Sequence, residues 1–453
     1  MAAAAAAANG GGDAVVYDVI VVGAGIMGSC AAYAAASSSS SSRVLLLEQF
    51  DLLHHRGSSH GESRTIRATY PQPHYPPMVR LAARLWHDAQ RDAGYTVLTP
   101  TPHLDMGPRD DAALLASIRN GGAVELAAGD GDGEAWAPSR VFRIPEGWTA
   151  ARSELGGVMK ATKAVAMFQA LAARSGAVVR DRTEVVDVTK RGDGLILVKT
   201  STGEEFQGAK CIITVGAWAS KLVKSVAGVD LPVTPLHTLI CYWKAKPGRE
   251  HELTPESGFP TFASYGQPYI YSTPSMEFPG LIKIATHGGP PCDPDSRDWL
   301  AGVVSGGAGA DLVEPVARRD WLAGVVSGGA GADLVEPVAR WIDEFMPDHV
   351  DTAGGPVIRQ SCMYSMTPDE DFIIDFVGGD FGKDVVVGAG FSGHGFKMGP
   401  AVGRILAEMA IDGEARTAAE AGVELRHFRI GRFEGNPEGN LAENKFKSWL
   451  KIT

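Results

Sequence analysis

Residues 17–36 read "YDVIVVGAGIMGSCAAYAAA" and carry the clearest structural pattern in the chain. A β-rich run, Val15–Val22, leads into Gly23, Gly25 and Gly28, and an alanine-rich helix follows. The spacing fits the G-x-G-x-x-G fingerprint, in which the first glycine permits a tight turn, the second lets pyrophosphate approach the backbone and the third allows close helix–strand packing. The N–H groups at the start of the helix favour phosphate. The stretch therefore predicts a dinucleotide site.

The next stretch completes one βαβ unit. Residues 43–50, "RVLLLEQF", contain a continuous apolar run typical of a buried parallel strand. Glu48 ends this run about 20 residues after the glycine turn, where a carboxylate can accept hydrogen bonds from ribose hydroxyls. A glycine turn that serves packing alone is the alternative. The flanking strand and helix, together with the acid, favour dinucleotide binding.

Further along, α/β segments flank a β-rich segment. Residues 161–174 have a helical pattern, and residues 383–411 predict a strand, a second glycine turn and a helix. Residues 223–290 are rich in Pro, Tyr and Thr and predict antiparallel strands. We therefore expect an α/β protein whose nucleotide-binding domain is assembled from separate segments, with a second domain inserted between them.

Length and composition limit the classes to which the chain can belong. At 453 residues it exceeds one compact core, and its 45% hydrophobic and 21% charged residues are ordinary for a soluble protein. The formal net charge of -11 argues against nucleic-acid binding, which needs clustered Lys and Arg. Because no apolar run reaches about 18 residues, no membrane span is expected.

The five cysteines indicate a reducing compartment. They are scattered, without the spacing of a disulfide framework, a metal site or a redox pair. His54, His55 and His60 have no carboxylate at ligand spacing, so we expect a polar loop and no metal. Residues 1–14 lack the basic residues of a signal peptide and are interpreted as a disordered tail. The final "KSWLKIT" does not match the peroxisomal S-K-L signal.

A tandem duplication interrupts the chain after the β-rich region. Residues 297–318, "RDWLAGVVSGGAGADLVEPVAR", recur identically at 319–340. Two copies are too few for a solenoid, which needs about three units to bury a shared face. Perfect identity indicates a recent duplication or an assembly error, and we expect a surface insertion without function.

Two basic residues lie close together in residues 58–70, "SSHGESRTIRATY". If this stretch is helical, Arg64 and Arg67 share a face, and two guanidinium groups there can bind carboxylate or phosphate. A solvated basic turn explains them equally well.

Lys397 and Lys283 each allow two interpretations, one functional and one structural. Lys397, in "GFSGHGFKM", lies near a helix start where its charge opposes the helix dipole, which indicates an anionic partner; a solvated lysine is the commoner case. Lys283 lies in an apolar strand, with His287 further along the same face. From the residues alone, we expect Lys283 on an exposed edge strand.

Five motifs occur in order along the chain. They are "VVGAGIMGS" (21–29), "SSHGESRTIR" (58–67), "GAWAS" (216–220), "CMYSMTPDEDFIID" (362–375) and "GFSGHGFK" (390–397). Jointly they resemble the monomeric sarcosine oxidase family of amine-oxidising flavoproteins, which includes pipecolate oxidase and N-methyltryptophan oxidase. The last two motifs are the most specific, and the resemblance extends from about Tyr17 to about Phe433.

The resemblance implies FAD as the cofactor and a glutathione-reductase-like α/β architecture. This is a Rossmann-like FAD-binding domain with an inserted mixed or antiparallel β-sheet substrate domain. The expected division is a disordered tail at 1–14, an FAD-binding domain at 15–95, 150–222 and 360–435, and a substrate domain at 96–149 and 223–359 that includes both repeats.

The resemblance also implies roles for single residues. Cys362 would carry the flavin through a thioether, which suits a thiolate nucleophile, although a buried structural cysteine is the alternative. Arg67 and Lys397 would clamp the substrate carboxylate. Lys283 would activate oxygen, which reverses the edge-strand expectation. Tyr271 and His287 would line the substrate pocket, and the other expected flavin contacts are Gly23, Gly25, Gly28, Glu48, His60, Ser63, Arg64, Gly393, His394 and Gly395.

The implied activity is oxidation of a secondary α-amino acid, sarcosine or L-pipecolate, to an imine, with oxygen reduced to hydrogen peroxide. The expected protein is a soluble intracellular monomer of the peroxisome or cytosol, with an amino acid and oxygen as partners and no nucleic acid, membrane or metal. Two other classes stay open: a nicotinamide-dependent dehydrogenase, which has no need of Cys362, and an inactive flavin-binding homologue disturbed by the duplication. Pocket size decides the substrate, and the sequence does not give it.

Overall fold

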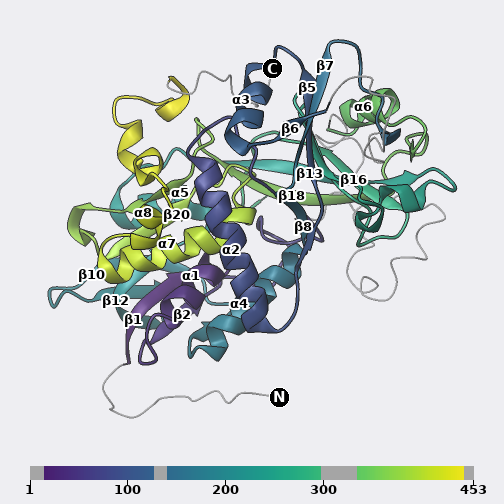
Figure 1. Cartoon of the computed structure of the whole chain (residues 1–453). Coiled ribbons are helices and arrows are strands. Elements are labelled where there is room, and N and C mark those ends of the chain that lie inside the picture. The colour runs from purple at the N-terminus through teal and green to yellow at the C-terminus, as the bar shows by residue number, and fades with distance from the viewer. Residues whose placement is uncertain (1–14, 127–139, 297–333, 443–453) are drawn as a thin grey trace.

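The computed structural model describes residues 15–126, 140–296 and 334–442, and Figure 1 shows how their helices and strands are arranged. The expected disordered tail and most of the duplication lie outside the described residues. The end of the second repeat copy is described, and there helix α6 (Glu336–Phe345) begins with Pro337 in its first turn. Proline suits this position because the N–H it lacks has no helical partner there.

The first sheet has eight strands and is built around β1 (Val16–Val22). β1 pairs in parallel with β2 (Val44–Leu47) on one side and with β12 (Glu205–Ile213) on the other. Alternate side chains of β1 enter separate apolar cores on the two faces, which explains its uninterrupted apolar sequence. The other strands are β9 (Val178–Arg180), β10 (Val185–Lys190), β11 (Ile196–Thr200), β19 (Ile373–Phe376) and β20 (Val385–Ala389).

Helices cover both faces of this sheet. One core contains side chains from α1 (Ile26–Ala36), α2 (Tyr75–Ala93), α4 (Ala161–Arg174) and α7 (Gly399–Asp412). The core on the other face includes α5 (Ala219–Ala227). The helix predicted at 161–174 and the strand–turn–helix predicted at 383–411 are both confirmed.

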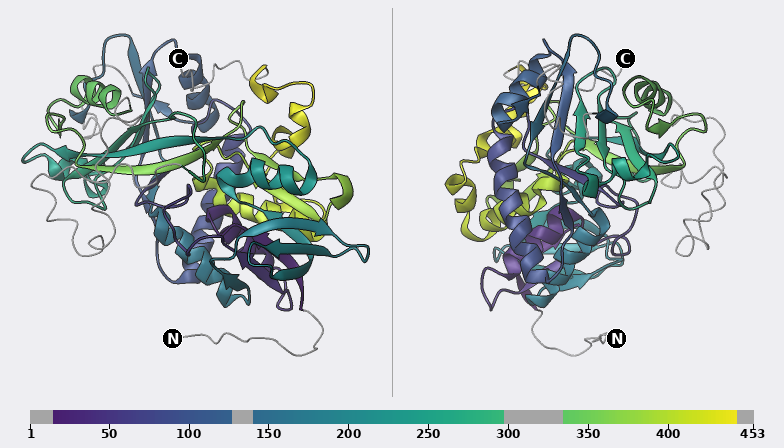
Figure 2. Two further views of the ribbon diagram at one scale, coloured as in Figure 1. Left: turned by 180° about the vertical axis from the view of Figure 1, so that it is seen from behind. Right: turned by 45° about the vertical axis from the view of Figure 1, so that its right-hand side comes forward.

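The second sheet has nine strands and lies above the first in Figures 1 and 2. Its strands are β5 (His103–Pro108), β6 (Val124–Glu125), β7 (Trp148–Ser153), β13 (Thr234–Ala245), β14 (Thr261–Ser264), β15 (Ile270–Thr273), β16 (Leu281–Thr286), β17 (Val350–Asp351) and β18 (Ile358–Met366). β5 and β14 are parallel and the other described pairs are antiparallel, so the expected mixed sheet is confirmed. The two remaining α-helices are α3 (Ala112–Gly121) and α8 (Arg416–Glu420).

A small third sheet corrects one sequence expectation. Residues Arg64–Arg67 form strand β3, which pairs with β8 (Gly156–Met159), while β4 (Leu98–Pro100) lies on the other side of β8. The helical arrangement considered for this stretch is therefore wrong. In a strand, residues three apart point to opposite faces, so Arg64 and Arg67 do not share one.

A second correction concerns Lys283. Its strand β16 lies between β13 and β15 in the second sheet, so the edge position expected from the residues alone is wrong. The lysine side chain is only 2% exposed.

The domain boundaries stay a prediction, although sheet membership bears on them. Residues 150 and 360, where we expected boundaries, fall inside β7 and β18, and both strands belong to the second sheet. The strand that carries Cys362 is thus hydrogen-bonded to β13 and not to the strands around β1.

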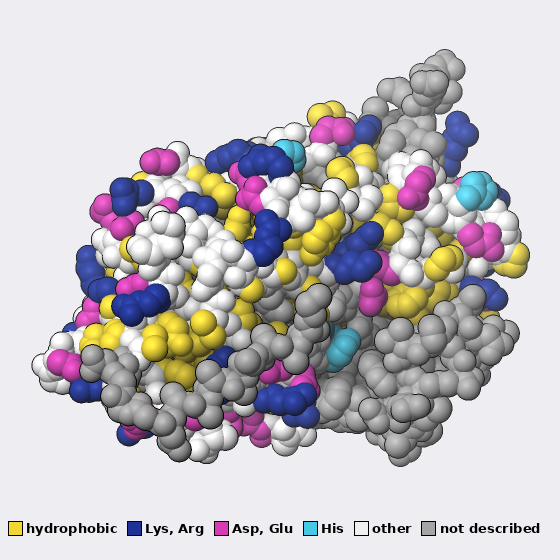
Figure 3. Space-filling view, turned by 90° about the horizontal axis from the view of Figure 1, so that it is seen from below, with side chains coloured by type: hydrophobic (Ala, Val, Ile, Leu, Met, Phe, Trp, Pro, Cys, Tyr) yellow, Lys and Arg dark blue, Asp and Glu magenta, His cyan; other side chains and the backbone are white. Residues whose placement is uncertain are grey.

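The face of the molecule seen in Figure 3 carries charges of both signs. Among the described residues on this face, Lys and Arg side chains are interspersed with Asp and Glu.

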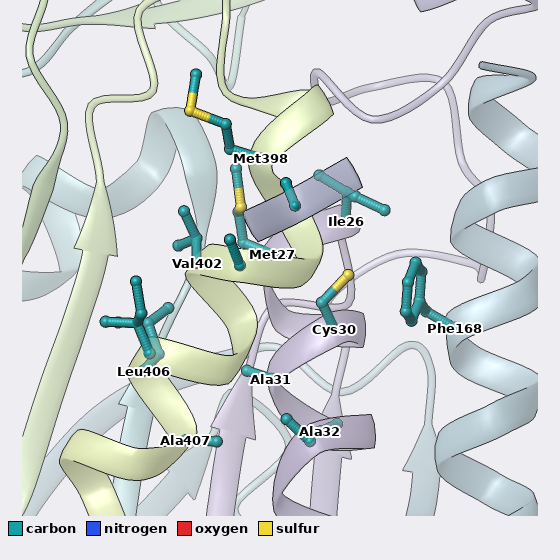
Figure 4. Close-up of a cluster of buried hydrophobic side chains, with 14 of the residues drawn as sticks. Ile26, Met27, Cys30, Ala31, Ala32, Phe168, Met398, Val402, Leu406 and Ala407 are labelled. Carbon is teal, nitrogen blue, oxygen red and sulfur yellow. The ribbon is translucent and has the colours of Figure 1, made fainter. Parts of the chain in front are cut away.

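Helices α1 and α7 pack unusually closely beside the glycine turn. Figure 4 shows α1, which carries Met27 and Cys30, beside α7, with Met27 next to Val402. A Cβ built on Gly403 would lie 2.5 Å from the Cβ of Cys30, which real Cβ atoms do not tolerate. The missing side chain at this position therefore sets the distance between the two helices.

We predict that Gly403→Ala lowers the melting temperature by a few degrees. Alanine gains about 1 kcal/mol of helix propensity, but overpacking against atoms that cannot rotate away costs about 1–3 kcal/mol. Gly192→Ala is the control, because a Cβ there meets nothing within 4 Å. A higher melting temperature for Gly403→Ala would show that the helices can separate at little cost.

Candidate active site

A cavity of about 540 Å³ is lined by residues of both large sheets. Its wall includes the β1–α1 turn, the end of β2, the third-sheet strand β3, strands β13, β15, β16 and β18, and the loop at 390–397. This volume lies in the range of about 300–1,000 Å³ usual for ligand sites. Segments far apart in the sequence therefore meet around one cavity.

The glycine turn has the strained geometry that its spacing predicts. Gly23 has φ +95°, and a Cβ there would lie 2.6 Å from the carbonyl oxygen of Thr214. A Cβ on Gly28 would lie 1.8 Å from the carbonyl oxygen of Gly23, so Gly28 allows the close approach of helix and turn. Gly23 and Gly25 line the cavity, whereas Gly28 lies behind them as a packing residue.

Glu48 supports this turn from the end of β2. One carboxylate oxygen accepts a hydrogen bond from the N–H of Ala24 at 2.8 Å, and the other accepts one from the N–H of Phe50 at 3.1 Å. Glu48 also lines the cavity. Its carboxylate is therefore fixed in the cavity wall, and its contact with a ribose stays a prediction.

Cys362 lies on β18 and faces the same cavity as the glycine turn. Its Sγ lies 3.6 Å from Nη2 of Arg64, and only 3% of the residue is exposed. Arg64 also donates to the carbonyl oxygens of Ser58, His60 and Ser63, so its guanidinium braces the loop before β3.

Arg67 and Lys397 come together around one aromatic ring. The Arg67 guanidinium carbon lies 4.8 Å from the centre of the Tyr70 ring, and Lys397 Nζ lies 5.4 Å from it. Lys397 Nζ donates to the Tyr70 hydroxyl and to the His394 carbonyl oxygen, each at 2.9 Å. Arg67 donates to the Tyr269 hydroxyl at 3.2 Å and to the Thr69 carbonyl oxygen.

The electrostatics of this pair favour an anion. Burial and then the nearby Arg67 charge lower the pKa of Lys397 well below its usual value. Burial, and then the charges of Arg67 and Lys397, lower the pKa of His287 to about 4. A carboxylate bound here would relieve the repulsion between Arg67 and Lys397 and raise the pKa of the lysine.

Lys283 lies near the ring of Tyr271, with Nζ 5.4 Å from the ring centre. Nζ donates to the carbonyl oxygen of Ser63 at 2.9 Å, and the Ser63 hydroxyl is 3.0 Å from that of Thr273. Burial and then the Arg64 charge lower the pKa of Lys283 to about 7. Lys283 and Tyr271 line the cavity, while Ser63 is buried behind it.

The loop at 390–397 uses glycines to pack tightly. Gly393 has φ +73°, and a Cβ there would lie 2.4 Å from the ring of Tyr364. Gly393, His394 and Gly395 all line the cavity. His394 is fixed by its two ring nitrogens, with Nδ1 3.2 Å from the Tyr70 hydroxyl and Nε2 3.1 Å from the Glu370 carbonyl oxygen.

The structure does not bring every predicted site residue to the cavity. Gly28, His60 and Ser63 are absent from its lining, whereas the other predicted site residues are present. His60 is buried next to His55, with ring centres 5.2 Å apart, and contributes its carbonyl oxygen to Arg64. These three residues lie around the cavity without lining it, and their predicted contact with flavin stays a prediction.

Sequence reasoning missed several residues that complete the pocket. Tyr70 and Tyr269 hydrogen-bond to the two cations, and His103 lines the cavity beside them. His103 Nε2 is 3.3 Å from a carboxylate oxygen of the fully buried Asp105. Tyr269 was detectable, because alternation along a strand places it on the same face as Tyr271.

The described residues offer neither a metal site nor a membrane span. No cluster of three or more His, Cys, Asp or Glu among them has a geometry that could hold a metal ion. In the same part of the chain, every helix is too short or too polar to cross a bilayer.

The residues present fit a dinucleotide cofactor. Gly25 is the N-cap of helix α1 and makes no side-chain cap, and the first turn of the helix contains no acid, which suits a phosphate at this end of the helix. On β13, Thr238 is paired in register with Cys362, and its buried hydroxyl makes no hydrogen bond with the described residues. A cofactor with polar ring atoms would satisfy this hydroxyl.

Comparison with known proteins gives consistent matches. The FAD dependent oxidoreductase family matches residues 18–409. The chain is 52% identical over 403 residues to the probable sarcosine oxidase of Arabidopsis thaliana, and the match covers 88% of this chain and 89% of that protein. It is 32% identical over 408 residues to the peroxisomal sarcosine oxidase of Homo sapiens, covering 88% and 92%.

One solved structure supports the fold independently. The open form of NikD, an unusual amino acid oxidase essential for nikkomycin biosynthesis, superposes with a TM-score of 0.70 over 91% of this chain and 97% of that chain. At 20% identity this likeness concerns the architecture alone.

Proposed function

The chain belongs to the FAD-dependent oxidoreductase family, as a flavin-dependent amine oxidase of the sarcosine oxidase group, and from this premise we propose that Arg67 and Lys397 hold a secondary α-amino acid for oxidation. The observation that carries the proposal is the meeting of these two cations at Tyr70, in the cavity that also contains the glycine turn and Cys362. Sarcosine and L-pipecolate are the candidate substrates. Sarcosine would give an imine that water hydrolyses to glycine and formaldehyde, and L-pipecolate would give a cyclic imine.

The two cations would bind the substrate by its carboxylate. A guanidinium and an ammonium beside the same ring can each donate to a carboxylate oxygen. The substrate is then held by one end in a pocket walled by Tyr269, Tyr271 and His287. Fixing the position of its C–H bond converts a bimolecular encounter into an oriented, effectively unimolecular step.

The pocket would also select the reactive form of the amine. A protonated nitrogen has no lone pair with which to expel hydride. Positive charge at Arg67 and Lys397 disfavours a further cation nearby and therefore lowers the pKa of the bound amine. His287 is neutral near pH 7 because its pKa lies at about 4, so it adds no charge of its own.

FAD, when bound, accepts the hydride and passes two electrons to oxygen, with hydrogen peroxide as the expected product. We assign Lys283 to the oxygen step. Its position beside Tyr271 and Arg64 places a potential positive charge inside the cavity, where negative charge develops on oxygen. Cys362 is proposed as the covalent attachment point, supported by its place in the cavity wall.

The finer assignments belong to the same proposal. The match to FAD-dependent oxidoreductases argues against the nicotinamide-dependent dehydrogenase. We propose a monomer, in line with the monomeric sarcosine oxidases that the motifs resemble. Of the two compartments expected, the name of the human relative supports the peroxisome.

Covalent attachment can be tested by acid precipitation. We predict that the flavin absorbance stays with the wild-type pellet and leaves with the supernatant in Cys362→Ala, because only the thioether survives unfolding. Cys241→Ala is the matched control, since Cys241 is also buried but lies outside the cavity lining. Free flavin in the wild-type supernatant would exclude a covalent bond.

The carboxylate clamp can be tested with acetate as a small ligand. We predict that Arg67→Ala and Lys397→Ala each weaken acetate binding, followed by the flavin spectrum, by about 10- to 100-fold, the range for a charge-assisted hydrogen bond of about 1.5–3 kcal/mol. Arg416→Ala, at an exposed ion pair with Asp412, is the control. Unchanged affinity in both clamp variants would show that the anion binds elsewhere.

The oxygen role of Lys283 predicts a selective defect. In Lys283→Met, stopped-flow measurements should show near-normal anaerobic reduction by substrate and slow reoxidation by oxygen, since only the second step develops charge on oxygen. If reduction alone slows, Lys283 serves the amino acid and not oxygen.

A further inference from the structure

A chain of hydrogen bonds leads away from Lys397 into the wall of the cavity. Lys397 Nζ lies 2.9 Å from the Tyr70 hydroxyl, and that hydroxyl lies 3.2 Å from Nδ1 of His394. Nε2 of His394 lies 3.1 Å from the carbonyl oxygen of Glu370. Tyr70, which is only 4% exposed, therefore links the lysine to a histidine of the lysine's own loop.

The last member of the chain fixes the direction of every bond in it. A carbonyl oxygen only accepts, so Nε2 of His394 carries a hydrogen and donates to Glu370. In a neutral imidazole Nδ1 is then an acceptor, and the Tyr70 hydroxyl donates to it. With its own hydrogen placed on His394, the Tyr70 oxygen accepts from Lys397, whose ammonium can only donate. All three bonds thus run in one direction, from the lysine to the carbonyl.

The surroundings of His394 favour the neutral ring that this direction requires. Burial, and then the Lys397 charge, lower the pKa of His394 well below its usual value, and His287 lowers it further. The hydrogen bond to Glu370 and the Asp371 charge raise the pKa, but they do not outweigh burial. The ring is therefore neutral near pH 7.

Aromatic neighbours hold the His394 ring in place. The Tyr75 ring packs edge-on against it, with ring centres 5.0 Å apart, and the Phe372 ring centre lies 4.7 Å away. Turning the imidazole away from Tyr70 would disturb both contacts. The acceptor offered to the Tyr70 hydroxyl is thus fixed by packing as well as by the bond to Glu370.

Lys397 is fixed at both ends. Its backbone carbonyl oxygen accepts a hydrogen bond at 2.8 Å from Nε1 of the fully buried Trp86. Its Nζ donates to the Tyr70 hydroxyl and to the His394 carbonyl oxygen, each at 2.9 Å. An ammonium has three N–H donors, so these two bonds with described residues leave one donor for a ligand. The two acceptors therefore determine where the third donor points.

We propose that Tyr70, held by its hydrogen bond to His394, is a positioning residue that orients the third donor of Lys397 towards the substrate carboxylate. This inference rests on the proposed clamp of Arg67 and Lys397. The Tyr70 ring lies 4.8 Å from the Arg67 guanidinium carbon, whereas its hydroxyl contacts Lys397. Removing the hydroxyl alone should therefore affect the lysine and spare the arginine contact.

The first test measures acetate binding to the holoenzyme through the flavin spectrum. In Tyr70→Phe, which keeps the ring, we expect affinity to fall about fivefold, the size of one net hydrogen bond. This loss is smaller than that in Lys397→Ala, because the lysine remains but is no longer held in position. Tyr33→Phe is the control, since the Tyr33 hydroxyl bonds to Asp92 at the surface.

A double-mutant cycle distinguishes positioning from a general structural effect. In a Lys397→Ala background, Tyr70→Phe should cause no further loss of acetate affinity, because no lysine is left to orient. In an Arg67→Ala background the loss of about fivefold should persist. A loss of equal size with and without Lys397 would show that Tyr70 acts independently of the lysine.

Two substitutions of His394 test the other end of the chain without changing Tyr70. The side-chain oxygen of asparagine is attached to Cγ, as Nδ1 of histidine is, so it can accept from the Tyr70 hydroxyl. Leucine offers no acceptor. We therefore expect His394→Leu to weaken acetate binding as Tyr70→Phe does, and His394→Asn to keep most of the affinity. Equal losses in both variants would overturn the role of His394.

NMR of 15N-histidine-labelled protein reads the direction of the chain itself. The His394 signals are identified by their loss in His394→Asn. We expect a neutral ring with its hydrogen on Nε2 between about pH 6 and pH 8, where an unperturbed histidine would titrate. An imidazolium in this range, or a hydrogen on Nδ1, would overturn the assigned direction.

The binding results separate this inference from the clamp. Unchanged acetate affinity in Lys397→Ala overturns the lysine's part in the clamp, and the role of Tyr70 with it. Weakened binding in Lys397→Ala together with unchanged binding in Tyr70→Phe overturns the positioning role alone. A loss in Tyr70→Phe that disappears when Lys397 is absent supports both.

Discussion

Buried positive charge is the constraint on which the rest of the site depends. Lys283 and Lys397 are 2% and 6% exposed, and their amines donate to carbonyl and hydroxyl oxygens rather than to carboxylates. Removing an ammonium from water is costly unless a partner charge compensates it. Lys283 donates to the carbonyl oxygen of Ser63, which is a dipole and not a full charge. For Lys397, whose charged neighbour is the cation Arg67, an incoming carboxylate is the natural partner.

The fold gathers these charges by joining two sheets along one cavity. The first sheet supplies the glycine turn, where tight packing of α1 against Thr214 and α7 fixes the wall. The second sheet supplies Lys283 from the interior strand β16 and Cys362 from β18, and both strands pair with β13. The short strand β3 lies between the two sheets. Its Arg64 side chain points towards Cys362, and its Arg67 side chain points towards Tyr269. Opposite faces of one short strand thus serve two ends of the same cavity.

The sequence predicted the parts of this arrangement that depend on local pattern. Gly23, Gly25 and Gly28 were identifiable because each backbone constraint requires glycine at that spacing. The interior position of Lys283 was not identifiable from the residues, since an apolar strand with one lysine resembles an edge strand until its neighbours are known. Tyr70 was missed because its importance comes from Lys397, a partner distant in the chain. The helix considered for Arg64–Arg67 was wrong because these residues form strand β3, which pairs with β8.

One measurement tests the central claim that the cavity is built for a buried carboxylate. Thermal melting of the wild-type holoenzyme is compared in the presence of acetate and of acetamide, which has nearly the same shape and no charge. Acetate should raise the melting temperature in a concentration-dependent manner, since a ligand that binds only the folded state stabilises it, and acetamide should have little effect. Equal stabilisation by both compounds would contradict a site organised around Arg67 and Lys397.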